Sequence, residues 1–173
     1  MPLCLERPLI LVGPMGSGKT TVGRALNRLT SLPLIDLDEE IVKFNGMSIP
    51  EIFKNFGESG FRERETAVLK TYIHEKAVLS SGGGIITVEE NRKLIKENCI
   101  CVFLDTSPLV QFKRTEHDNN RPMIDTEDRL ARLENLYAKR LPFYKEVADF
   151  TVNTDELGPK KLAVLIDEFL ENR

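Results

Sequence analysis

The stretch Gly13-Pro14-Met15-Gly16-Ser17-Gly18-Lys19-Thr20 matches the phosphate-binding loop pattern G-x-x-x-x-G-K-[ST] at every fixed position. Its glycines allow backbone N–H groups to approach phosphate oxygens, where a side chain would obstruct them. Lys19 can reach the β- and γ-phosphates of a nucleotide, and the Thr20 hydroxyl can ligate Mg²⁺. We therefore expect this loop, together with Thr21, to bind a nucleoside triphosphate.

The residues on both sides of the loop agree with this interpretation. Residues 8–12 form a continuous apolar run, which is typical of a strand buried on both faces. After the loop, Val22, Ala25, Leu26 and Leu29 recur at helical spacing. The N-terminus of that helix would add the positive end of its dipole to a phosphate site.

The remainder of the chain alternates between expected strands and helices, without a repeat or a linker. The expected strands lie at 32–36, 77–80, 100–104 and 150–152, and the expected helices at 48–56, 61–75, 89–96, 107–115, 129–139 and 160–170. Such alternation implies a parallel sheet that is covered by helices on both faces. The sequence predicts one α/β domain over 1–173, with the three-layer P-loop NTPase fold of nucleoside monophosphate kinases and a five-stranded parallel sheet.

Composition and charge exclude several classes of partner. The 173 residues are 41% hydrophobic and 29% charged, and the net charge of −3 does not favour nucleic acid or anionic membranes. No apolar run approaches the roughly 20 residues that span a bilayer. The first strand begins too early for a signal peptide. Three cysteines form no disulfide framework and fit a reducing cytosol. We expect a cytoplasmic monomer that binds neither nucleic acid nor membrane.

Two further groups follow expected strands, at the sheet edge where ligands collect. Asp36 and Asp38 would lie on one side of an extended chain, where one could orient Mg²⁺ through water and the other could contact a substrate hydroxyl. The alternative is a turn with a helix N-cap. The run Gly82-Gly83-Gly84 indicates a close approach of the backbone to a helix, a turn or a ligand.

Three arginines are candidates for binding anions. The guanidinium of Arg62 can hold a carboxylate bidentately, although pairing with Glu65 would also explain it. Arg121 lies in the polar segment 116–128, which we expect to be a mobile lid. Arg140 lies just before Pro142, where we expect the helix to break. Each arginine alone is also typical of a solvated surface.

Taken together, six motifs in order and at suitable spacing resemble those of shikimate kinases, from the phosphate loop to the final helix. They are Gly13 to Thr20, Asp36-Leu37-Asp38, Phe61-Arg62-Glu63-Arg64-Glu65, Gly82-Gly83-Gly84, Arg121-Pro122 and Arg140-Leu141-Pro142-Phe143-Tyr144. The phosphate loop is shared with many NTPases, whereas the combination of F-R-x-x-E, G-G-G and D-x-D is far more specific.

The resemblance implies transfer of the γ-phosphate of ATP to the 3-hydroxyl of shikimate, giving shikimate 3-phosphate and ADP on the route to chorismate and the aromatic amino acids. On the acceptor side, it implies that a helical region at about 37–64 contributes to the substrate site. There Asp38 would hold the acceptor hydroxyls or act as base, and Arg62 and Arg140 would bind the carboxylate. The ring would lie against the residues Phe53, Phe61, Gly82, Gly83 and Gly84.

On the donor side, the resemblance implies that Lys19 and Arg121 neutralise charge on the phosphoryl group. Thr20, and Asp36 through water, would place Mg²⁺, and Arg114 would flank the adenine. The segment that ends at Pro159 would lie on the other side of the base.

Two other hypotheses remain open at this point. One is a related small-molecule kinase, either gluconate kinase-like or a nucleoside monophosphate kinase; the G-G-G run and the Phe61-Arg62 pair argue against it. The other is a non-catalytic nucleotide-binding homologue, which the intact Lys19, Asp38 and Arg121 disfavour.

Overall fold

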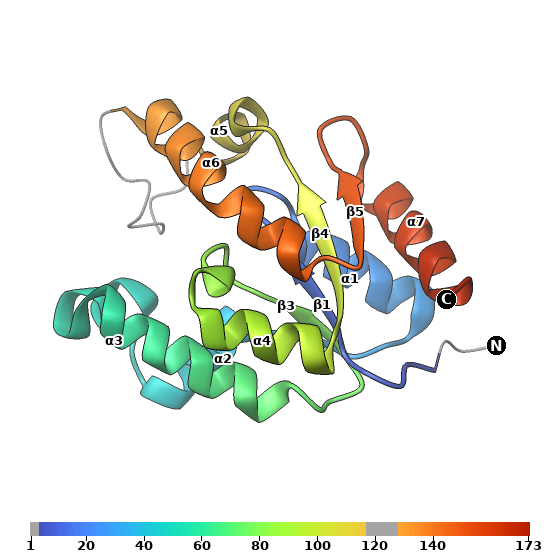
Figure 1. The fold of residues 1–173 in the computed structure, drawn as a ribbon, viewed down its shortest axis with the longest axis horizontal. Helices are drawn as coiled ribbons and strands as arrows, with labels where there is room; N and C mark the ends of the chain where they lie inside the picture. The colour runs from blue at the N-terminus through green and yellow to red at the C-terminus, as the bar shows by residue number, and fades with distance from the viewer. Residues whose placement is uncertain (1–3, 117–127) are drawn as a thin grey trace.

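The fold is built on a five-stranded sheet with the strand order β2-β3-β1-β4-β5 (Figure 1). The computed structural model describes residues 4–116 and 128–173. All four neighbouring pairs of strands are parallel, which confirms the predicted sheet. The strands are β1 (Leu9–Val12), β2 (Leu34–Asp36), β3 (Val78–Ser80), β4 (Ile100–Asp105) and β5 (Phe150–Asn153).

Helices cover both faces of the sheet. On one face lie α1 (Lys19–Thr30) and α7 (Pro159–Glu171), which pack against each other. On the other face lie α2 (Leu37–Asn45), α3 (Ile49–Tyr72), α4 (Glu89–Asn98) and α6 (Arg129–Val147), with α5 (Pro108–Thr115) against α6 (Figure 1). A short 3₁₀ turn, η1 (Ile85–Thr87), connects β3 to α4.

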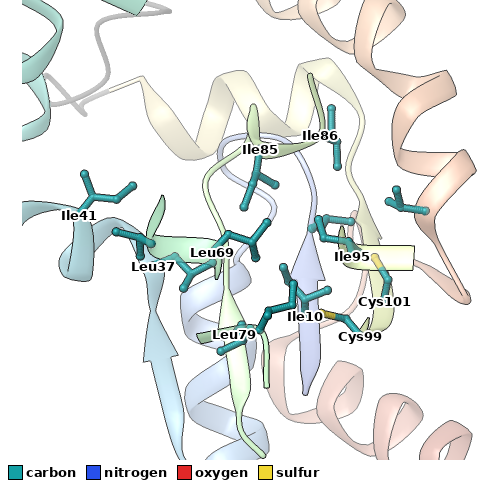
Figure 2. Close-up of a cluster of buried hydrophobic side chains, with 14 of the residues drawn as sticks. Ile10, Leu37, Ile41, Leu69, Leu79, Ile85, Ile86, Ile95, Cys99 and Cys101 are labelled. Carbon is teal, nitrogen blue, oxygen red and sulfur yellow. The ribbon is translucent and has the colours of Figure 1, made fainter. Parts of the chain in front are cut away.

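The alternating side chains of the strands divide the core into two layers. In β1, Ile10 and Val12 pack toward α2, α3, α4 and α6, whereas Leu9 and Leu11 pack toward α1 and α7. Figure 2 shows part of the first layer, around Ile10. All four residues of β1 are inaccessible to solvent, as expected for a central parallel strand. Helices thus cover both faces of the sheet, whereas the C-terminal ends of its strands remain available for a binding site.

One local expectation is confirmed and two differ from the structure. The helices expected at 48–56 and 61–75 lie on the two sides of a kink in α3 at Gly57, whose φ of 71° and ψ of −176° are non-helical. The helix α2 is an additional element between β2 and α3. The expected break before Pro142 is wrong, because α6 continues to Val147. Tyr144 and Val147 are buried on this last part, and their packing offsets the roughly 3 kcal/mol cost of an internal proline.

Candidate active site

The predicted phosphate-binding loop, residues 13–20, connects β1 to α1. Gly16 and Gly18 have φ values of 79° and 87°, which are left-handed and favour glycine. A Cβ atom at Gly13 would lie 2.6 Å from the Leu104 carbonyl oxygen, so a larger residue would displace the loop. The loop therefore needs its glycines for its own conformation and for its close contact with β4.

Lys19 is the first residue of α1, and its side chain is buried against the loop. Its Nζ donates hydrogen bonds to the carbonyl oxygens of Gly13 at 2.7 Å and Pro14 at 3.0 Å. Ser17 Oγ lies 3.4 Å from the same nitrogen. The ammonium group is thus held within the loop, where phosphate oxygens would bind.

Three oxygen-bearing side chains lie together beside the loop. Asp36 is opposite Ser80 in the pairing of β2 with β3. The Thr20 hydroxyl, at the start of α1, donates to Asp36 Oδ2 at 3.2 Å and lies 3.1 Å from Ser80 Oγ. Oxygen donors of this kind suit Mg²⁺, which usually binds one or two protein groups together with phosphate and water. In the described part of the chain, no cluster of three or more acidic, histidine or cysteine residues offers an alternative metal site.

For Asp36 and Asp38 the structure confirms the alternative considered from the sequence, a helix N-cap, rather than an extended chain. Asp36 is the N-cap of α2, and its Oδ1 accepts from the backbone N–H of Asp38 at 3.0 Å and of Glu39 at 3.2 Å. Asp38 lies in the first helical turn, so the expectation of an extended segment is wrong. Capping bonds of this kind stabilise a helix that begins directly after β2.

These groups line one cleft of about 300 Å³ at the C-terminal edge of the sheet. Most of the predicted phosphate and metal residues contribute to it, along with the start of the glycine run. The lining consists of Gly16, Gly18, Lys19, Thr20, Thr21, Asp36, Asp38, Ser80, Ser81, Gly82, Gly83 and Arg114. The structure therefore brings the loop, both aspartates and the glycine run into one site.

The two residues predicted near the adenine differ in their positions. Arg114 Nη1 donates to the Gly16 carbonyl and to Thr154 Oγ1, each at 3.0 Å, and its Nη2 donates to the Thr154 carbonyl at 2.8 Å. Arg114 thus connects the phosphate loop to the segment after β5. Pro159 is the first residue of α7 and is not among the residues that line the cleft.

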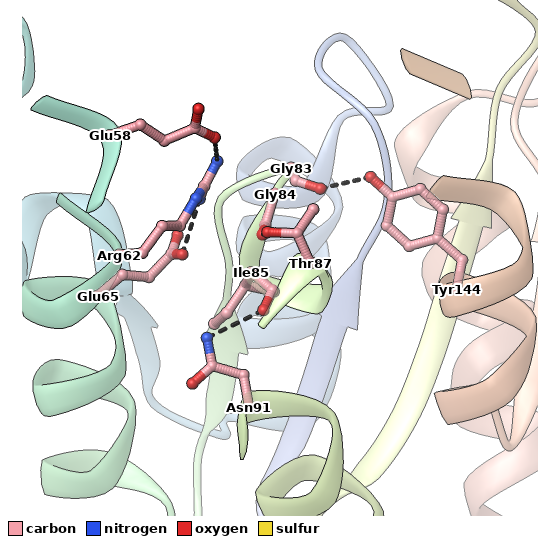
Figure 3. Close-up of polar contacts among 9 residues, drawn as sticks. All are labelled: Glu58, Arg62, Glu65, Gly83, Gly84, Ile85, Thr87, Asn91 and Tyr144. Carbon is pink, nitrogen blue, oxygen red and sulfur yellow. Dashed lines mark hydrogen bonds and ion pairs between the residues drawn. The ribbon is translucent and has the colours of Figure 1, made fainter. Parts of the chain in front are cut away.

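Arg62 forms a buried ion pair in α3 (Figure 3). Its Nη1 donates to Glu65 Oε1 at 2.8 Å, and its Nη2 lies 3.6 Å from Glu58 Oε1. The side chains of Arg62 and Glu65 are 12% and 1% exposed, so the pairing weighed from the sequence is confirmed, but it is buried rather than solvated. Burial raises the pKa of Glu65 to about 7, although Arg62 opposes the shift.

The glycine run after β3 passes directly beside these charged groups. A Cβ atom at Gly82 would lie 3.0 Å from Asp38 Oδ1 and 3.1 Å from Glu65 Oε2. At Gly84 it would lie 2.2 Å from Arg62 Nη2. The run is therefore glycine-rich because acidic and basic side chains crowd against its backbone.

Arg140 approaches the same cluster from α6. Its side chain is buried, and burial lowers the pKa of Arg140, with the positive charge of Arg62 acting in the same direction. Two guanidinium groups near the neutral backbone of the glycine run suit an anionic ligand.

Two aromatic rings lie next to Arg62. Phe53 and Phe61, both on α3, stack with their ring centroids 4.7 Å apart. The Arg62 guanidinium lies 5.1 Å from the Phe61 ring. The two predicted aromatic residues and Arg62 thus lie together around the kink of α3 at Gly57.

Arg121 and most of the predicted lid lie outside the described residues. Two buried residues were not predicted as residues of the site, although both occur in the motifs quoted above and Glu65 was considered as a partner of Arg62. Glu65 is the last residue of F-R-x-x-E, and Tyr144 is the tyrosine that follows Arg140 by four positions. Their positions in those two motifs could have identified them from the sequence.

None of the helices in the described part of the chain combines the length and the apolar character of a membrane span.

Comparisons with known proteins agree with the geometry. The sequence model of the shikimate kinase family matches residues 15–171. A shikimate kinase of Thioalkalivibrio sulfidiphilus is 44% identical over 162 residues, which cover 93% of this chain and 85% of that protein. One from Neisseria gonorrhoeae is 47% identical over 147 residues, covering 84% of this chain and 86% of the relative.

Solved structures of similar proteins have the same fold. The shikimate kinase of Acinetobacter baumannii, solved in complex with shikimate, superposes with a TM-score of 0.92 at 41% identity, covering 96% of this chain and 94% of that one. The Aquifex aeolicus shikimate kinase gives 0.83 at 36% identity, with 95% and 96% covered. Since the family model and these relatives match most of its length, the chain belongs to the shikimate kinase family and is an ATP-dependent phosphotransferase with an alcohol acceptor.

Proposed function

We propose that the chain transfers the γ-phosphate of ATP to the 3-hydroxyl of shikimate, giving shikimate 3-phosphate and ADP in the pathway to chorismate. One observation carries the assignment of residues. The cleft lined by the phosphate loop and the cluster around Arg62 meet at Asp38 and Gly82, which belong to both. A donor phosphate and a carboxylate-bearing acceptor would therefore bind on opposite sides of Asp38.

On the donor side, the loop N–H groups and Lys19 would bind the triphosphate, and Arg114 would lie next to the adenine. Thr20 and, through water, Asp36 would hold Mg²⁺, and their oxygen donors fit that ion. When bound, the ion neutralises charge on the phosphate oxygens. Lys19 would stabilise the charge that develops on the transferred group.

On the acceptor side, Arg62 and Arg140 would bind the shikimate carboxylate. The backbone of Gly83 and Gly84 and the rings of Phe53 and Phe61 would contact the cyclohexene ring. The ring hydroxyls would then face Asp38. Phosphoryl transfer depends mainly on the positioning of the two reactants. Binding the acceptor through both its carboxylate and its hydroxyls would therefore account for much of the catalysis.

Asp38 would bind the 3-hydroxyl and orient it toward the γ-phosphate, and its carboxylate could take the proton that leaves on transfer. It is the acidic residue that the cleft shares with the acceptor side, where a Cβ atom at Gly82 would lie 3.0 Å from Asp38 Oδ1 and 3.1 Å from Glu65 Oε2. Loss of the carboxylate should remove turnover while the fold remains.

The sequence alone supports the part that we propose for Arg121 and the lid at about 116–128. There, closure of the segment would exclude water and bring Arg121 to the phosphoryl group. The sequence also supports a single domain over 1–173, acting as a monomer in the cytoplasm. The three cysteines, all free, fit a reducing compartment.

The test is ADP release from MgATP with shikimate, gluconate, AMP or CMP as the acceptor, each measured separately. We expect shikimate alone to accelerate release. Acceleration by gluconate or a nucleoside monophosphate instead would favour the related kinases, and no acceleration by any acceptor would favour a non-catalytic homologue. The matched control is the variant Asp38→Asn, which removes one negative charge without a change in size. ADP release that depends on this site should be lost in this variant.

A further inference from the structure

Tyr144 lies behind the glycine run and is completely buried in α6. Its hydroxyl donates a hydrogen bond to the carbonyl oxygen of Gly83 (Figure 3). Its ring stacks on Phe103 of β4, with centroids 4.7 Å apart and planes 13° from parallel. The stacking on a central strand fixes the ring, so the hydroxyl has a defined position at the glycine backbone.

Arg140 lies one helical turn earlier in α6, so its side chain and that of Tyr144 are neighbours on one face of the helix, and both are buried. Tyr144 also counteracts the lowering of the pKa of Arg140. A phenolic oxygen has one proton to donate and lone pairs that accept. It can therefore donate to the Gly83 carbonyl while it accepts from the guanidinium. One buried atom is thus bonded to the glycine backbone and placed next to the residue that carries a cation on the acceptor side of the site.

We infer that Tyr144 is a positioning residue for the acceptor carboxylate, because its hydroxyl fixes the Arg140 guanidinium relative to the backbone of Gly83. The inference rests on the proposed function, in which Arg140 binds that carboxylate. Tyr144 would not touch the substrate. It would set the distance between two groups that do.

The phosphate loop has supports of its own that do not involve the Tyr144 hydroxyl. Lys19 holds the loop from within through the Gly13 and Pro14 carbonyls, and Arg114 holds Gly16. None of these bonds involves α6. Loss of the Tyr144 hydroxyl should therefore weaken acceptor binding and leave nucleotide binding almost unchanged.

The test is Tyr144→Phe, which keeps the stacked ring and removes only the hydroxyl. We expect the KM for shikimate to rise about tenfold, since a buried carbonyl and a buried guanidinium each lose a partner. The KM for ATP should stay within about twofold. An unchanged KM for shikimate, or an equal rise in both KM values, would overturn the inference.

The control is Tyr72→Phe. Tyr72 is the last residue of α3 and lies well beyond Arg62 in that helix. Its hydroxyl donates a hydrogen bond to Glu40 Oε2 at 2.6 Å. This variant also loses a tyrosine hydroxyl that pairs with another side chain, so it shows what a general loss of stability does. We expect both of its KM values to match those of the wild type.

A double-mutant cycle with Arg140→Met separates this inference from the proposed function. If Tyr144 acts through Arg140, Tyr144→Phe should add less than about threefold to the shikimate KM of the Arg140→Met variant. Fully multiplicative effects would contradict that route. A shikimate KM unaffected by Arg140→Met would instead refute the assignment of Arg140 itself.

A second variant covers the case in which Tyr144→Phe does not fold. Tyr144→4-aminophenylalanine keeps a donor for the Gly83 carbonyl but accepts poorly from Arg140. We expect a shikimate KM between those of the wild type and Arg140→Met, with an unchanged KM for ATP. A KM for shikimate equal to that of the wild type would refute the contact with Arg140 as a positioning device.

Discussion

Replacing Glu65 with glutamine tests the energetic cost of the buried acidic group beside Arg62. Glu65 Oε1 accepts from Arg62 at 2.8 Å, whereas Oε2 has no hydrogen-bond partner among the described residues. Burial raises the pKa of Glu65 from 4.5 to about 7, and the charge of Asp38 adds to the shift while Arg62 and Arg140 oppose it. The charged carboxylate is therefore less favourable in the fold than the neutral acid.

The sign of the pH dependence follows from this shift. Because the folded protein binds the proton more tightly than the unfolded chain, the stabilisation is complete below pH 4.5 and is lost as the pH rises through about 7. At about 1.4 kcal/mol per pKa unit, the rise of the Glu65 pKa from 4.5 to about 7 amounts to about 3 to 4 kcal/mol. Glutamine remains neutral throughout, so Glu65→Gln should gain up to about 3 to 4 kcal/mol relative to the wild type between about pH 4.5 and 8.

The assay is urea unfolding followed by circular dichroism at several pH values, because the chain contains no tryptophan. The matched control is Glu58→Gln, which removes the other carboxylate near Arg62. Since the side chain of Glu58 is 54% exposed, this variant should differ from the wild type by less than about 1 kcal/mol. A difference between Glu65→Gln and the wild type that does not vary with pH would refute the reasoning.

Three further predictions concern the loop, the glycine run and the thiols. Thr20→Val removes a hydroxyl that bonds Asp36, and we expect the Mg²⁺ concentration for half-maximal rate to rise about tenfold; an unchanged requirement in a metal titration would exclude Thr20 as a ligand. Gly84→Ala would place Cβ 2.2 Å from Arg62 Nη2 and should displace that arginine. We expect the KM for shikimate to rise at least about tenfold and the KM for ATP to change little. Parallel changes in the two KM values would contradict a local displacement of Arg62. In the native protein, a thiol reagent should modify exposed Cys4 rapidly while the two buried thiols react only after unfolding; rapid reaction of all three would contradict their burial.

Much of the fold could be predicted because its signals are local. The apolar run of β1, the glycines of the loop and the helical spacing after it each report on adjacent residues. The order of the strands agrees with the general rules for β-α alternation. By contrast, the end of α6 depends on the burial of Tyr144 and Val147 against other elements, which outweighs the local effect of Pro142.

The candidate site was predictable in its members but less so in its geometry. Asp36 and Asp38 line the cleft as expected, but a capping bond, rather than an extended chain, sets their positions. The ion pair of Arg62 with Glu65 was foreseen as an alternative to a ligand contact. Its burial was not, because burial depends on α2 and the glycine run packing around it.

The central claim is that the acceptor is held by its carboxylate, opposite the phosphate loop. The most direct measurement compares kcat/KM for shikimate with that for its methyl ester, which keeps the hydroxyls and removes the negative charge. We predict that the ester is at least about 100-fold poorer, because Arg62 and Arg140 would then be buried opposite a neutral group. Equal values of kcat/KM for the acid and the ester would contradict the account.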